Sequence, residues 1–153
     1  MLARRVRSLS AGCVTAMTPT RWNMADRRSE TELRQFYERW AAVVDTFCRL
    51  YLGNPTVAEE VVAESFLQYF RRELPLWLDH VPTALMSLAL EESNCRVDVA
   101  EGEAGSDFEW AMLRLPPDQR AVFILHGVLG LQLPWVAAVT RIGYAEVCRL
   151  WVC

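Results

Sequence analysis

Apolar side chains recur at helical spacing between residues 33 and 51, and this spacing constrains the fold more than any other feature of the chain. The apolar positions are Leu33, Phe36, Tyr37, Trp40, Val43, Val44, Phe47, Leu50 and Tyr51. Such a period places them along one face of an α-helix. Ser29 and the acidic residues after it are typical of a helix start, and Gly53, Asn54 and Pro55 form a stop signal. We therefore expect one long amphipathic helix whose apolar face other parts of the chain must bury.

The same reasoning predicts two more helices after this one. A second helix is expected from about Thr56 onward. Its apolar positions are Val57, Val61, Val62, Phe66, Leu67 and Phe70. Pro75 and Pro82 bracket a turn or a short helical piece, and a third helix is expected from Thr83 to Ser93. The three helices would form a first domain over residues 29–96.

The remainder of the chain is predicted to be a second helical domain. Residues 97–107 are acidic and rich in small residues and lack an apolar period, which is typical of a linker. The helices expected after the linker cover residues 108–115, 118–129, 134–140 and 144–153. Short helices with tight turns are typical of a helix-turn-helix module. The predicted fold class is all-α, with two small helical domains, at 29–96 and 108–153, joined by the acidic linker at 97–107.

Residues 1–28 are predicted to be a disordered basic tail. Residues 1–25 contain Arg4, Arg5, Arg7 and Arg21 and no acidic residue. An arginine-bearing start without acidic residues is also compatible with a mitochondrial transit peptide. A start codon assigned too far upstream, with Met17 or Met24 as the true start, explains the same composition more simply.

Composition and motif content exclude several classes of protein. Charges or prolines interrupt every apolar run before the roughly 18 residues that a membrane span needs, so we expect a soluble, cytoplasmic chain without membrane contact. The five cysteines are scattered and form no CxxC pair, and the two histidines lie far apart, so no disulfide framework, metal site or cofactor is predicted. No nucleophile elbow, phosphate-binding loop or carboxylate pair appears, so we expect no enzyme. A net charge of -3 excludes coating of nucleic acid by charge alone.

A recognisable pattern occupies residues 54–70, which read NPTVAEEVVAESFLQYF. This segment resembles the core-binding helix in region 2 of the extracytoplasmic-function sigma factors, bacterial proteins that start transcription. The positions that match are Ala58, Glu59, Glu60, Val61, Val62, Glu64, Phe66 and Leu67, preceded by Tyr37, Leu50 and Gly53.

A second pattern begins at Leu115. Residues 115–125 read LPPDQRAVFIL, are followed by Gly130 and Leu131, and are similar to the opening of sigma region 4. Positions that fit the family's helix-turn-helix follow at Val136, Ala137, Ile142 and Val147. The two patterns occur in the family's order and separation and together span most of residues 31–150, which makes the order more specific than either motif.

The resemblance implies a partner for the second helix. In the family this helix binds core RNA polymerase at the clamp helices of the largest subunit. The implied polymerase-binding residues are Glu59, Glu60, Glu64, Phe66 and Leu67. Carboxylates on successive turns of a helix can pair with an arginine-rich surface. Without the resemblance, the same carboxylates would be interpreted as an ordinary solvated helix face.

The resemblance also implies weak contact with promoter DNA and an anti-sigma factor as a possible further partner. The implied DNA-binding residues are Arg141, Tyr144, Glu146 and Arg149. A recognition helix reads base edges and phosphates with polar or basic side chains. This set is small, so the resemblance implies weak affinity for DNA.

The helix expected to begin at Thr83 departs from the family in its DNA-facing positions. The family's tryptophan aligns with Ala84, its arginines with Ser87 and Leu90, and its asparagine with Glu91. Stacking of unpaired bases needs aromatic faces, and backbone contact needs positive charge. The scaffold of this helix is therefore kept, while the groups that would open a promoter are replaced.

Region 4 departs from the family in the same direction. The turn glycine of the family aligns with Arg141, and an acidic position aligns with Pro134 and Trp135. The recognition helix holds only Arg149 where the family has several basic residues. Two arginines provide little of the counterion release that supports binding to DNA.

Three functional readings follow. The leading prediction is a sigma-factor-like transcription initiation protein that binds core RNA polymerase and directs it to promoter DNA. The alternative is a sigma-like adaptor or decoy that binds polymerase or an anti-sigma factor without promoter recognition. A third possibility is a truncated gene product whose apolar C-terminus needs a partner, its apolar residues being Val147, Leu150, Trp151 and Val152.

Overall fold

The computed structural model describes residues 22–74, 81–97 and 105–152, with the side chains of 22–29 and 81 left out. Within these ranges the chain is all-α and has no strand, so the predicted fold class is confirmed. The first helix, α1, spans Trp22–Leu52 and begins before the expected start at Ser29. No proline or glycine interrupts the chain between these two positions, so the helix can extend into what the sequence predicts as tail. Residues 1–21 of that predicted tail lie outside the described residues.

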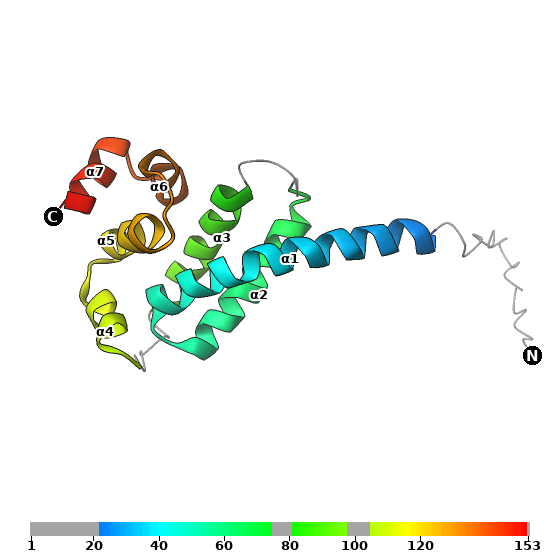
Figure 1. Cartoon of the computed structure of the whole chain (residues 1–153), viewed down its shortest axis with the longest axis horizontal. Helices are drawn as coiled ribbons and strands as arrows, with labels where there is room; N and C mark the ends of the chain where they lie inside the picture. The colour runs from blue at the N-terminus through cyan, green and yellow to red at the C-terminus, as the bar shows by residue number, and fades with distance from the viewer. Residues whose placement is uncertain (1–21, 75–80, 98–104, 153) are drawn as a thin grey trace, which may run out of the picture.

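Three helices form the first half of the molecule (Figure 1). After α1 come α2, Pro55–Arg71, and α3, Val81–Arg96. Gly53 adopts a left-handed backbone with φ of +69°, and the side chain of Asn54 accepts a hydrogen bond from the Val57 amide at 3.1 Å. The turn and the N-cap that the sequence indicates therefore connect α1 to α2 as a helical hairpin. The segment between the two prolines, residues 75–80, lies outside the described residues.

The second half begins with α4, Asp107–Arg114, whose start carries a reciprocal cap between Ser106 and Glu109. It continues with α5, Pro117–Val122, and the π-helix η1, Phe123–Val128. The last helices are α6, Leu133–Thr140, and α7, Tyr144–Val152. The expected helix over 118–129 is therefore continuous, but its end widens into a π-turn. There the Leu129 amide donates to the Ile124 carbonyl, five residues earlier, at 2.9 Å.

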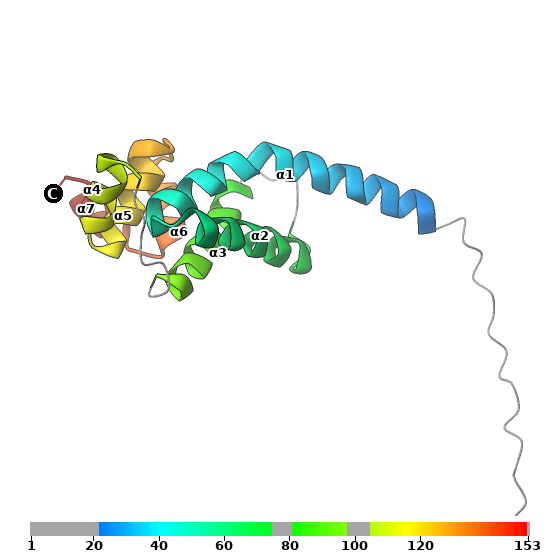
Figure 2. The same cartoon turned by 90° about the horizontal axis from the view of Figure 1, so that it is seen from below.

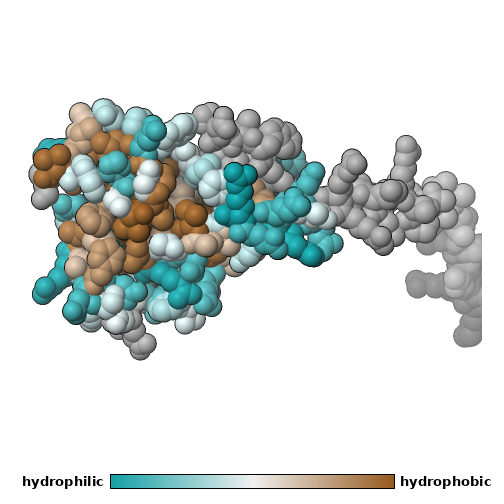
Figure 3. All heavy atoms as spheres, in the orientation of Figure 1, coloured by the Kyte–Doolittle hydropathy of each residue, from teal (hydrophilic) through white to brown (hydrophobic). Residues whose placement is uncertain are grey.

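The two halves pack against each other and share one apolar core. The second half lies across the end of the α1–α3 bundle, and the N-terminal part of α1 projects from the body (Figures 1 and 2). Apolar surface gathers over the second half in Figure 3, whereas the described part of the α1 projection is hydrophilic. The largest fully buried side chains come from both halves and include Phe47, Tyr51, Tyr69, Leu85, Met86, Ile124, Leu125 and Val136.

Gly53 allows the two halves to approach closely. A Cβ atom at this position would lie 2.5 Å from Cδ1 of Leu113 on α4. The left-handed backbone and the close contact both require a residue without a side chain. The turn that ends α1 is therefore also a packing surface for the second half.

Candidate functional site

The outward face of α2 carries the first two implied polymerase-binding carboxylates. Glu59 Oε1 lies 3.2 Å from Nη2 of Arg49 on α1, and Glu60 Oε2 lies 2.6 Å from Nη1 of Arg96 on α3. The two neighbouring acids therefore turn to opposite flanks of α2. Both remain solvent-accessible, with side chains 69% and 59% exposed.

The third carboxylate, Glu64, pairs along its own helix. Its Oε1 lies 3.4 Å from Nη1 of Arg71, and its side chain is only 31% exposed. Ion pairs at a protein surface contribute about 0–1 kcal/mol because water and salt screen them. All three acids have arginine partners within the chain. Replacing these arginines by arginines of another molecule would therefore change the free energy little.

The two apolar residues implied at this surface differ in exposure. Leu67 is 47% exposed, as is fitting for a contact residue, and the nearby α1 residue Tyr37 is 45% exposed. Phe66 is only 3% exposed. The centre of its ring lies 4.7 Å from the ring centre of Tyr37 and 6.0 Å from that of Phe36. Phe66 is therefore buried in the free chain, and its part in polymerase binding stays a prediction. It belongs to the core and supports Tyr37 from below.

A shallow groove between α1 and α2 adjoins the same carboxylates. It has a volume of about 450 Å³ and is lined by Tyr37, Asp45, Arg49, Glu59 and Val62 together with alanines. The alanines, Ala41, Ala42 and Ala63, leave room at the surface where the two helices pack. Sequence reasoning missed this groove, although small residues on the facing sides of two predicted helices were the available signal.

The face of α3 that would meet DNA in a sigma factor is covered by the second half. Ser87 Oγ donates to the Val139 carbonyl of α6 at 3.4 Å, and also to the Thr83 carbonyl at 2.9 Å. Glu91 forms an ion pair with Arg141, at the end of α6. Leu90 is only 8% exposed. Three positions that lack the family's DNA-facing groups are therefore buried or occupied by contacts within this chain.

Arg141 occupies an unusual backbone conformation. It is the C-cap of α6 and has φ of +58°, in the left-handed region that glycine adopts without strain. The position aligns with the turn glycine of the sigma factors that the sequence resembles, and here an arginine adopts the backbone conformation that glycine favours. Its guanidinium contacts Glu91, which ties a DNA-binding candidate to the other half of the molecule.

The remaining DNA-binding candidates lie on α7. Tyr144 is 55% exposed at the start of the helix. Glu146 and Arg149 form two hydrogen bonds, of 2.9 Å and 2.5 Å, and hydrogen bonding to the guanidinium lowers the pKa of the Glu146 carboxyl. Glu146 is therefore charged at neutral pH and neutralises the nearest arginine, which weakens any attraction of α7 to phosphate.

A buried arginine joins the two halves. Arg120 of α5 is 7% exposed, and its Nη1 donates to the Tyr51 carbonyl at 2.7 Å. Its Nη2 donates to the carbonyls of Leu113 and Leu115 at 2.8 and 3.1 Å. These carbonyls end α1 and α4, where helix dipoles place partial negative charge. Burial lowers the pKa of Arg120 and raises that of Tyr51.

Sequence reasoning did not assign Arg120 a role beyond its place in the second pattern. Its guanidinium lies over the Tyr51 ring, 5.4 Å from the ring centre. The sequence offered little signal, because Arg120 directly follows the polar residues Asp118 and Gln119, where an arginine is ordinarily exposed. The partners, three main-chain carbonyls, leave no trace in the sequence.

The described ranges hold neither a metal-binding cluster nor a membrane-spanning helix. No group of three or more histidine, cysteine or acidic side chains is placed there to hold a metal ion. None of the helices in these ranges is long and apolar enough to cross a bilayer.

Comparison with known proteins finds a likeness among solved structures. No protein-family model matches the chain, and no curated protein sequence matches it. Among solved structures the chain is similar to CnrH, in the structure of CnrH in complex with the cytosolic domain of CnrY. The TM-score is 0.64 and the identity 16%, over 78% of this chain and 80% of that chain. CnrH is an extracytoplasmic-function sigma factor, so the fold of this chain is sigma-factor-like, and at this identity the likeness concerns the fold alone.

Proposed function

We propose that this chain is a sigma-factor-like transcription protein that docks on core RNA polymerase in the cytoplasm through the outer face of α2. The single observation that carries the proposal is that this face stays accessible while the two halves are packed together. The second half packs on α1 and α3, and Glu59, Glu60 and Leu67 remain exposed. The resemblance of residues 54–70 to the family's core-binding helix supplies the partner, the clamp helices of the largest subunit.

The docking step is an exchange of arginine partners. In the free chain the carboxylates of α2 pair with Arg49, Arg96 and Arg71. An arginine-rich partner surface would compete for the same carboxylates while Leu67 and Tyr37 lose contact with water. The apolar burial would provide net affinity, and the charges would fix the register of the contact.

A pull-down of core RNA polymerase tests this proposal. The charge-reversed variant Glu60→Arg plus Glu64→Arg is expected to retain at least tenfold less polymerase than the unmodified chain. The matched control, Glu32→Arg plus Glu38→Arg, makes the same change in net charge at exposed positions of α1 and is expected to bind like the unmodified chain. Equal retention of polymerase by all three proteins would show that the α2 carboxylates are not part of the interface.

A second candidate function is an adaptor or decoy that docks on polymerase without promoter recognition. The observation that favours it is the contact between α3 and α6. Here Ser87 donates to the Val139 carbonyl, and Glu91 forms an ion pair with Arg141. Such a protein would displace a sigma factor from core polymerase and lower transcription. Run-off transcription with a promoter-specific sigma factor separates the candidates, since a decoy decreases the product and an active sigma factor adds new start sites.

A regulatory partner is proposed on the same footing. CnrH is solved in complex with the cytosolic domain of CnrY. We extend to this chain the expectation of an anti-sigma partner. This partner would bind the chain while its two halves are packed together and would compete with polymerase for it. Co-purification from the native host after cross-linking would test it, and recovery of polymerase alone would speak against such a partner.

A further inference from the structure

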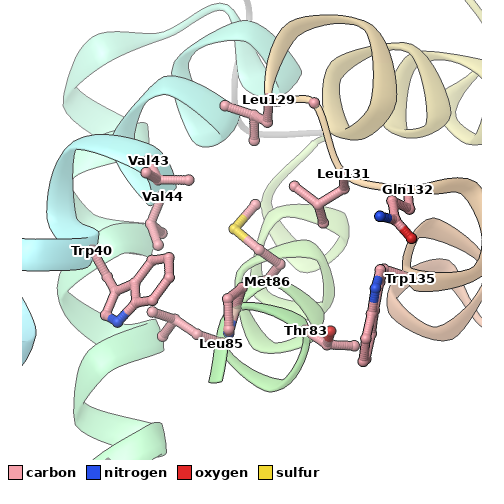
Figure 4. Close-up of a pocket in the computed structure, with 12 residues that line it drawn as sticks. Trp40, Val43, Val44, Thr83, Leu85, Met86, Leu129, Leu131, Gln132 and Trp135 are labelled. Atoms are coloured by element: carbon pink, nitrogen blue, oxygen red, sulfur yellow. The ribbon is translucent and has the colours of Figure 1, made fainter. Parts of the chain in front are cut away.

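A cavity of about 350 Å³ lies between the two halves and belongs to none of the surfaces described so far. Its walls come from Trp40 and Val44 of α1, Met86 of α3, Leu131 of the connection from η1 to α6, and Trp135 of α6. In Figure 4 these side chains surround an open space, with Met86 in the middle and Leu131 extending toward it. The volume falls at the lower end of the roughly 300–1,000 Å³ typical of small-molecule pockets.

The chemistry of the walls selects a class of ligand. None of the residues that line the cavity carries a charge, and the polar ones are Thr83, Gln132 and the two tryptophans. A charged molecule would lose its hydration without gaining a counter-charge, so a neutral molecule is favoured. Trp40 and Trp135 offer aromatic faces, and Met86 adapts its shape to what it contacts.

The rim of the cavity is held in place by hydrogen bonds. The Leu131 amide donates to the Leu125 carbonyl at 2.9 Å, and Nδ1 of His126 lies 2.6 Å from the Leu131 carbonyl. Gly130 has φ of +72° and no atom within 4 Å of where its Cβ would be, so the rim is open beside it. The π-turn of η1 leads directly into this rim, and π-turns often occur at functional sites. A pocket fixed in this way needs little reordering to bind a ligand.

We propose that this cavity binds a small, neutral, largely aromatic molecule with one hydrogen-bonding group directed at Thr83 and Gln132. The ligand would touch α1 and α3 of the first half and the η1–α6 connection of the second. Its binding would therefore stabilise the packed arrangement of the halves. No residue of α2 lines the site, so its occupancy and polymerase docking can be measured separately.

A matched set of three probes tests the chemical class on the full-length chain: 2-naphthalenemethanol, 2-methylnaphthalene and 2-naphthoate. Ligand-observed NMR and thermal denaturation are expected to show binding of the neutral alcohol, with a Kd at least tenfold lower than that of the carboxylate. Equal affinity for alcohol and carboxylate, or no binding of either neutral probe, would overturn the proposal.

Two sets of variants locate the binding site. Leu131→Trp plus Val43→Phe adds bulk inside the cavity and is expected to raise the Kd of the alcohol at least tenfold, whereas Val128→Phe adds a ring at an exposed position of η1 and should not. If the filled variant does not fold, Gln132→Leu decides the matter. Gln132 is exposed and makes no side-chain cap bond, so its replacement leaves the fold intact. The substitution should raise the Kd of the alcohol about fivefold and leave the Kd of 2-methylnaphthalene unchanged. An unchanged ratio between the two Kd values would contradict the proposed polar contact.

Discussion

Two neighbouring helices of the first half, α2 and α3, both align with functional helices of sigma factors but are used in opposite ways. The outer face of α2 keeps the family's carboxylates and meets solvent. The corresponding face of α3 lacks the family's DNA-facing groups and packs against α6 through Ser87 and Glu91. The difference shows that two neighbouring helices of one bundle can present opposite surfaces, since the outer face of α2 meets solvent while α3 contributes to an internal interface.

The largest expected effect comes from restoring the family's arginine on the covered helix. Leu90→Arg places a charge at a position that is 8% exposed, so we expect a loss of about 4 kcal/mol in the free energy of unfolding. Leu67→Arg makes the same change on α2 at a position that is 47% exposed, and its effect should stay within about 0.5 kcal/mol. Urea unfolding measures both. Similar losses of unfolding free energy for the two variants would contradict the contrast between a covered α3 and an exposed α2.

The next effect concerns the buried arginine that joins the halves. Arg120→Leu removes three hydrogen bonds and leaves buried helix-end carbonyls without donors, so we expect a loss of about 3 kcal/mol. Arg114→Leu, at an exposed position of α4, is the matched control and should change stability little. Urea denaturation followed by circular dichroism compares them. If Arg120→Leu leaves the free energy of unfolding unchanged, the halves pack independently of this residue.

A smaller effect is expected where α4 meets the turn between α1 and α2. Gly53→Ala introduces a Cβ at φ of +69° and 2.5 Å from Leu113, which should cost about 2 kcal/mol. Leu113→Ala in the same chain removes the close contact and leaves only the backbone strain. A double-mutant cycle by chemical denaturation separates the two contributions. Additive effects would place the whole cost in the backbone and none in the contact between halves.

The smallest effect concerns the connection between α3 and α6. Arg141→Gly relieves the left-handed backbone but loses the ion pair with Glu91, whereas Arg141→Ala loses the ion pair and keeps the strain. The glycine variant should therefore be more stable than the alanine variant by about 1 kcal/mol. Thermal denaturation tests this, because both variants lack the ion pair and the remaining difference lies in the backbone. If alanine equals glycine, the backbone at this position is not strained.

The helices and their order could be predicted from apolar spacing and from the glycine, proline and asparagine signals between them. The limits of α2 follow from Asn54 and Pro55, and the left-handed Gly130 after η1 follows from the stop signal. The start of α1 could not be placed, because residues 22–28 contain no helix breaker and offer no apolar period to mark a boundary.

The candidate site could be predicted only where it is local. Glu59, Glu60 and Leu67 are exposed as a helical projection of α2 requires, whereas the burial of Phe66 depends on the aromatic rings that α1 presents to it. The covering of α3 by α6 and the carbonyl partners of Arg120 join residues far apart in the chain. Periodicity reports which face of a helix is apolar, but not which distant helix will cover it.

The contacts of Arg120 also imply an order of events during synthesis. The carbonyls of Tyr51, Leu113 and Leu115 all belong to residues that leave the ribosome before Arg120 does. Domains generally fold from the N-terminus as they emerge. The α1–α3 bundle would thus be complete, with α3 still uncovered, while the last helices are being translated. A nascent chain therefore passes through a stage in which the surface later closed by α6 is open to other molecules in the cell.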